Sequence, residues 1–134
     1  MPTTDPVGTA VGSIGAGATS GAVLMTGGVF VLRLMQAGDP ASVSPDVGGA
    51  ILSVAVSTGL LAAVAVAWLR SRSIDDVWRR GVTAAVAVFG TVILSVLAAP
   101  VDSVAGTAGL GAYLAVLLIA TFATHRAARR AARA

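Results

Sequence analysis

The sequence contains no cysteine, lysine, glutamate or asparagine. Without cysteine it cannot form disulfides, use a thiolate nucleophile or bind zinc and iron–sulfur clusters through sulfur. Charge is scarce as well, because only 11% of the 134 residues are charged, whereas a soluble domain carries about 25%. All nine basic residues are arginine and all six acidic residues are aspartate. The lack of lysine and asparagine is typical of a GC-rich genome, so we expect a prokaryotic source.

Apolar residues dominate what is present. They make up 56% of the chain, and the mean hydropathy is +0.89. A fold in water needs a polar exterior that so few charges cannot supply, which excludes a soluble enzyme and a disordered chain. The arginines cluster at the ends of apolar runs. We therefore interpret the net charge of +3 as a signal of membrane topology and not of nucleic-acid binding.

Four long uncharged runs separate the charges. They contain 27, 23, 21 and 23 residues and are bounded by Asp5 and Arg33, Asp46 and Arg70, Arg80 and Asp102, and Asp102 and Arg126. A helix needs about 20 apolar residues to cross the bilayer core, where every backbone group must be satisfied within the segment. The sequence therefore predicts a single all-α domain, an integral-membrane bundle of four transmembrane helices. We place these helices at about 10–36, 46–70, 76–99 and 104–128.

The predicted connections contain turn and capping residues. Residues 37–45 are rich in glycine and proline, which break helices. The aspartates at 75–76 precede the third helix, whose positive end favours anions. We expect the third connection at residues 100–103, with Asp102 or Ser103 as the N-cap of the last helix.

Arginine placement orients the predicted bundle. Eight arginines lie in the second connection and in the basic tail over residues 126–134, namely Arg70, Arg72, Arg79, Arg80, Arg126, Arg129, Arg130 and Arg133. Four helices put both segments on one side, and the positive-inside rule makes that side cytoplasmic. We expect both termini in the cytoplasm of a multi-pass cell-membrane protein, with these arginines on anionic lipid headgroups. Seven identities between residues 28–56 and 90–118 further suggest two helical-hairpin repeats.

Small residues recur at intervals of four on the first two predicted helices. They are Ser13, Gly17 and Gly21 on the first, and Gly49, Ser53 and Ser57 on the second. Such residues let helices approach closely, which drives association in lipid. We expect them to pack helices together, within the chain or between chains. The alternative is a hydroxyl-lined path in an oligomer, formed by Ser57, Thr91, Ser95 and Tyr113.

Signals for catalysis and cofactor binding are weak. His125 is the only histidine, and a role as a haem ligand would need a second ligand, from Met25, Met35 or another chain. We expect it to sit at the membrane interface. No serine has a histidine or lysine near it in the sequence, and the predicted membrane midplane holds no charge for coupling to ions. We therefore expect no enzyme activity, no metal and no cofactor.

Arg33 is the one arginine off the basic side, close to Asp39 and Asp102 in the predicted topology. We expect a structural role at the membrane interface, where its long side chain can reach the headgroups, and contact with a partner or substrate is the alternative. Two functions fit the chain as a whole. The first is a non-catalytic accessory or structural subunit of a larger membrane complex, with lipid and other transmembrane subunits or copies of itself as partners. The second is a homo-oligomeric channel or transporter for a small solute.

Overall fold

The described part of the chain consists of four helices and their connections. The computed structural model describes residues 6–39, 43–72 and 74–133. In chain order the helices are α1 (Pro6–Gly38), α2 (Pro45–Arg70), α3 (Val77–Val96) and α4 (Ala98–Arg133). Each contains a stretch that is long and apolar enough to cross a membrane. The prediction of an all-helical protein with four such helices is therefore confirmed.

Two helices begin at residues that satisfy free backbone N–H groups. At the start of α2, the Ser44 hydroxyl accepts a hydrogen bond from the backbone N of Val47 at 3.3 Å. Pro45 follows it at a position where a missing N–H costs nothing. At the start of α3, Asp76 Oδ1 accepts from the backbone N of Trp78 at 3.0 Å, as the aspartates at this site predicted.

The third connection does not lie at residues 100–103, where the sequence predicted it. These residues are helical, so neither Asp102 nor Ser103 is an N-cap. The Ser103 hydroxyl instead donates to the carbonyl of Ala99, one turn back in the same helix, at 3.1 Å. The side chains of Asp102 and Ser103 are typical of an N-cap, but the backbone does not begin a helix at either residue.

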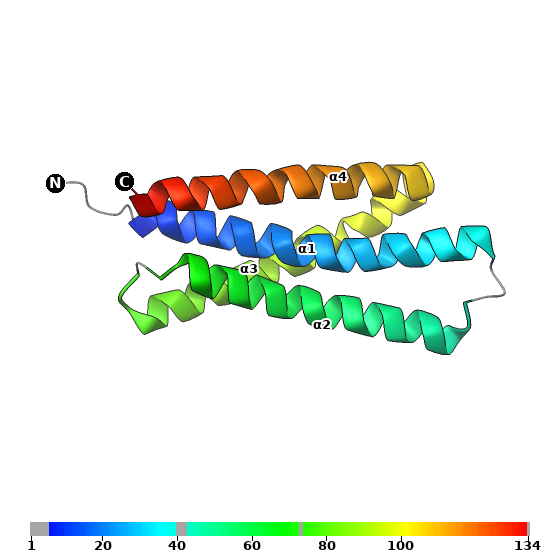
Figure 1. Ribbon diagram of the computed structural model, residues 1–134, viewed down its shortest axis with the longest axis horizontal. Coiled ribbons are helices and arrows are strands. Elements are labelled where there is room, and N and C mark those ends of the chain that lie inside the picture. The colour runs from blue at the N-terminus through cyan, green and yellow to red at the C-terminus, as the bar shows by residue number, and fades with distance from the viewer. Residues whose placement is uncertain (1–5, 40–42, 73, 134) are drawn as a thin grey trace.

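A proline and a glycine explain the actual course of the chain. Pro100 has no N–H for the carbonyl of Val96, and the helix is interrupted at Leu97. The sharper break comes at Gly106, where φ is 69° and ψ is −161°, a conformation that suits a residue without a Cβ. The chain then returns as the long second part of α4 (Figure 1).

α1 lies at the centre of the bundle. It packs against α2, α3 and α4, whereas α3 touches α4 sparsely and α2 and α4 scarcely meet. Successive helices run in opposite directions, so both ends of the chain lie beside the α2–α3 connection (Figure 1). We call this the basic end, because it holds the arginines of residues 70–80 and 126–133. The opposite end, with residues 33–39, 43–46 and 100–106, is the distal end.

Glycines bring α1 into close contact with α2 and α3. A Cβ on Gly21 would lie 2.5 Å from Thr91 Oγ1 and 2.6 Å from the carbonyl oxygen of Gly59. A Cβ on Gly17 would lie 2.7 Å from a backbone carbonyl of α2, so only hydrogen fits at either position. Ser13, one turn before Gly17, is completely buried. Close van der Waals contact of this kind is what holds helices together in lipid.

The face of α2 that meets α1 does not contain Gly49, Ser53 and Ser57. Gly49, Ser53 and Ser57 are all exposed, and a Cβ on Gly49 would touch nothing. Within the chain they do not pack helices. The buried stripe is shifted around the helix and contains Ala55, Gly59, Ala63 and Ala67. Both faces offer small residues, but only this one adds no hydroxyl groups to the contact.

A methyl group at Gly21 tests the close contact. We expect Gly21→Ala to lower the free energy of unfolding by about 1–3 kcal/mol, because the contact cannot accept the added carbon. Gly27→Ala is the control, since a Cβ there meets nothing within 4 Å. Denaturant unfolding in detergent micelles, followed by circular dichroism, measures both. Equal stability of the two variants would contradict the packing.

Candidate functional site

Hydroxyl groups predicted to line a path are engaged inside the fold. Thr91 Oγ1 donates across the α3–α1 contact to the carbonyl of Ala18 at 2.9 Å. The Ser95 hydroxyl donates to a methionine sulfur on α1 at 3.2 Å, and that of Tyr113 to a backbone carbonyl of α3 at 2.5 Å. Ser57 is exposed on the surface of α2. Within one chain, three of these four hydroxyls are therefore engaged in contacts between helices, and Ser57 lies on the outer surface.

Arg80 fastens α3 to the end of α2 at the basic end. Its guanidinium carbon lies 4.0 Å from the ring centroid of Trp68, and its Nη2 donates to the Trp68 carbonyl at 2.7 Å. The Ser71 hydroxyl bonds the same carbonyl at 3.1 Å. The two residues are twelve positions apart, on either side of the charged connection between α2 and α3. The only sequence signal for this contact was a tryptophan before the connection and an arginine after it.

His125 connects three helices at the same end. Arg70 Nε, on α2, lies 3.1 Å from His125 Nδ1, and Ser20 Oγ, on α1, lies 3.2 Å from His125 Nε2. An arginine can only donate, so Nδ1 is the acceptor and Nε2 carries the proton that is donated to Ser20. The neutral ring therefore bridges α1, α2 and α4, and neither ring nitrogen is left free for a metal.

Ser20 lies beside the only histidine of the sequence, at the basic end of the bundle. The length of their contact matches that of a nucleophile and its base. A base, however, needs an unprotonated Nε2 to take the serine proton, and catalytic triads secure this with a carboxylate at Nδ1. Here Arg70 occupies Nδ1 and selects the opposite tautomer. The Ser20–His125 contact therefore serves to hold helices together and not to activate the serine.

Arg33 forms an ion pair at the distal end. Its Nη2 lies 3.0 Å from Oδ2 of Asp102, and the two side chains are 49% and 20% exposed. The pair connects α1 to the first turns of α4, just before the break at Gly106. A salt bridge and a glycine hinge thus set the position of this segment against α1.

Two apolar grooves open on the sides of the bundle. The first, which we call the glycine groove, has a volume of about 600 Å³ and lies over α1 between α2 and α4. Gly27 and Gly28 line it on α1, together with larger residues that include Leu24, Val31, Ile51, Val54 and Leu114. A Cβ on Gly27 would meet nothing within 4 Å, whereas one on Gly28 would collide with Ala55. Gly27 therefore leaves a notch in the surface of α1.

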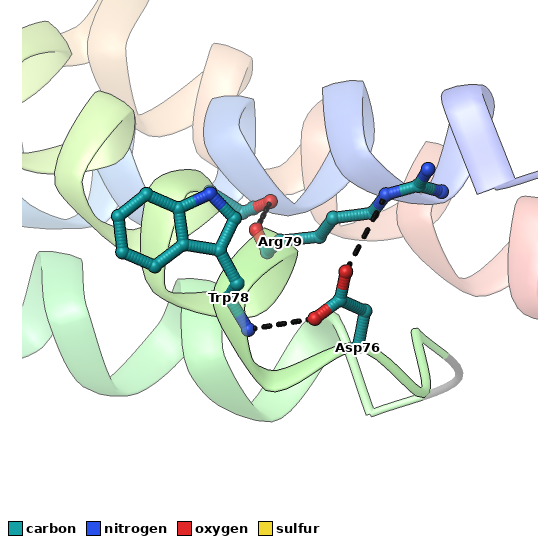
Figure 2. Close-up of polar contacts among 4 residues, drawn as sticks. Asp76, Trp78 and Arg79 are labelled. Carbon is teal, nitrogen blue, oxygen red and sulfur yellow. Dashed lines mark hydrogen bonds and ion pairs between the residues drawn. The ribbon is translucent and has the colours of Figure 1, made fainter.

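The second groove, which we call the Trp78 groove, lies between α1 and α3 at the basic end and has a volume of about 590 Å³. Its walls are apolar apart from one arginine and one threonine, and its lining residues are Ala10, Val11, Ile14, Ile74, Trp78, Arg79, Val82, Thr83 and Val86. Figure 2 shows Asp76 between the backbone of Trp78 and the side chain of Arg79. Arg79 Nε lies 3.8 Å from Asp76 Oδ2, and the Arg79 side chain is 75% exposed.

The remaining predicted arginines lie at the basic end of the bundle. Arg72, Arg126, Arg129 and Arg130 are exposed, and Arg133 is the last residue of α4. In the stretches that the structure describes, no three histidine and aspartate side chains gather as a metal site requires.

The chain matches no protein-family model, no curated protein and no solved structure. Its function must therefore be inferred from the geometry of the bundle.

A double-mutant cycle tests the ion pair between Arg33 and Asp102. Because the pair is partly exposed, we expect a coupling energy of about 0.2–1 kcal/mol from Arg33→Gln, Asp102→Asn and the double variant. Unfolding in micelles measures it. If the effects simply add, the pair does not hold α4, and Arg33 is available for the alternative role in contact with a partner or substrate.

Proposed function

We propose that the chain is a non-catalytic accessory subunit of a larger membrane complex. The observation that carries this proposal is the glycine groove, an apolar channel along α1 that the chain leaves unfilled between α2 and α4. The chemistry of the buried groups points the same way. The one serine–histidine contact has the wrong tautomer for catalysis, and the hydroxyls of Thr91 and Ser95 are engaged in contacts between helices.

The glycine groove has the small, apolar residues that a transmembrane helix of another subunit would pack against. Helix pairs in lipid form where small residues let the backbones approach, and Gly27 has open space above its Cα. The groove also lies on the most buried helix of the bundle. A helix docked there would contact α1, α2 and α4 at once, and would join the two helices that scarcely meet within the chain.

The proposal includes an orientation. The basic end would face the cytoplasm, with both termini, because arginine-rich segments stay on that side of a cell membrane. Trp68, stacked under Arg80, and the exposed Trp78 lie at this end, as is typical of residues at the interface. The distal end, with Arg33 and Asp102, would face outward.

A second candidate is a homo-oligomeric channel or transporter. It is favoured by the exposed Gly49, Ser53 and Ser57, which place two hydroxyls and an open glycine on the outer face of α2. Copies joined along this face could enclose a path that one chain does not.

Filling the notch at Gly27 tests the accessory role. We expect Gly27→Leu to leave the fold intact but to reduce a co-purifying transmembrane subunit by about tenfold or more, because the side chain fills the docking surface. Gly81→Leu, at an equally open glycine on α3, should retain it. A photo-crosslinking residue at Val31 in the groove should capture the same subunit, and one at the exposed Phe89 on α3 should not.

The measurement is the native mass of the complex extracted gently from its own membrane. A chain that forms only homo-oligomers, and that conducts or takes up solute in liposomes, would overturn the accessory role in favour of the channel.

Cysteine labelling tests the orientation, since the natural chain has no cysteine. We expect a membrane-impermeant maleimide to label Ala37→Cys, near the distal end of α1, on intact cells. It should label Val77→Cys, at the start of α3, only after lysis. Both residues are exposed. Labelling of both positions from the same side would contradict the proposed topology.

A further inference from the structure

We propose that the Trp78 groove binds one anionic phospholipid, with its phosphate on Arg79 and an acyl chain between α1 and α3. The site is separate from the glycine groove and does not depend on the accessory role. It lies at the basic end, where Figure 1 places the start of α1 beside the α2–α3 connection.

The groove has the polarity of a lipid, with one charged end and one apolar length. Among the residues that the structure describes, Arg79 is the only charged one that lines it. The Thr83 hydroxyl donates to the carbonyl of Arg79 at 2.8 Å, so this residue contributes mainly its methyl group to the groove wall. From Arg79 to Val86 the groove follows α3 for about 10 Å, at 1.5 Å per residue. Along this length it offers apolar walls to the upper part of an acyl chain.

Arg79 differs from Arg80 and Arg70, whose guanidinium groups are engaged by other residues. Arg80 is stacked on Trp68 and bonded to its carbonyl, and Arg70 donates to His125. Arg79 approaches Asp76 only through Nε, and at 3.8 Å this is too long for a hydrogen bond. In Figure 2 the other two guanidinium nitrogens of Arg79 point away from Asp76. They form the planar fork that binds a phosphate through two hydrogen bonds.

Asp76 does not oppose an anion as strongly as its charge suggests. Its Oδ1 accepts the backbone N–H of Trp78 at the positive start of α3. Its Oδ2 lies on the Nε side of Arg79, which orients the guanidinium and leaves the fork open. Arg72, Arg126, Arg129 and Arg130 are also exposed at the basic end and outnumber Asp75 and Asp76, so this end should attract an anionic headgroup more than a zwitterionic one.

The mouth of the groove favours a lipid over a second helix. Trp78, next to Arg79 in the sequence, is 78% exposed, and an exposed tryptophan near an arginine is typical of headgroup level in a membrane. A helix docked here would need an acidic residue of its own opposite Arg79. A phospholipid supplies the phosphate and the acyl chain in one molecule.

Native mass spectrometry of the purified chain, titrated with phosphatidylglycerol or phosphatidylcholine, tests the site. We expect one phosphatidylglycerol to be retained preferentially, and Arg79→Gln to weaken this binding by about tenfold, as loss of a charge-assisted contact should. Arg72→Gln is the matched control, because it removes the same charge from the same end of the bundle, at an exposed residue that does not line the groove. It should change the binding by less than about twofold, the size expected of a screened surface charge.

A second variant tests the acyl-chain half of the site. Ala10→Trp fills the groove without changing its charge, and it should abolish retention of the lipid while leaving the helical content unchanged. Equal effects of Arg79→Gln and Arg72→Gln would overturn the proposal, because headgroup binding would then be diffuse. Retention of the lipid by Ala10→Trp would overturn it as well. So would a photo-crosslink from Val11, in the groove wall, to another protein chain.

Discussion

The contact of α1 with α2 and α3 through bare glycines is the constraint on which the rest of the structure depends. At Gly17 and Gly21 the backbone of α1 lies against the backbone of α2, so no side chain separates the helices. Lipid offers no hydrophobic gain for burying larger side chains, so the bundle is held by close contact over small ones. The buried apolar residues are accordingly mostly alanine, and most of the large apolar side chains lie outside, where lipid could solvate them.

This close contact also determines where polar groups go. Because the helices approach so closely, Thr91 bonds a carbonyl of α1, and His125 links α1, α2 and α4. These polar side chains thus form contacts that hold the helices together. The unoccupied surfaces are grooves, and they differ in kind: the glycine groove is apolar throughout, whereas the Trp78 groove ends in an arginine. The first suits a helix of another subunit and the second suits a lipid.

The number of helices could be predicted from the sequence because charges cannot lie in the middle of a membrane span. The spacing of a few arginines and aspartates therefore marks the helix ends. The packing face of α2 could not be predicted from the sequence, since Gly49, Ser53 and Ser57 have the same spacing as Ala55, Gly59 and Ala63. The choice between these faces depends on α1. Likewise, Asp102 signalled a cap more strongly than Gly106 signalled a turn, and the contact of His125 with Arg70 joins residues too distant in sequence to pair by pattern.

The most direct test of the glycine contact uses the unaltered protein. Nuclear Overhauser effects between glycine Hα protons and alanine methyl groups, measured in lipid nanodiscs, report helix approach at van der Waals distance. The structure predicts cross-peaks from Gly17 to Ala67 and Ala87, and from Gly28 to Ala55. Absence of all three, with cross-peaks between α2 and α4 in their place, would contradict a bundle built around α1.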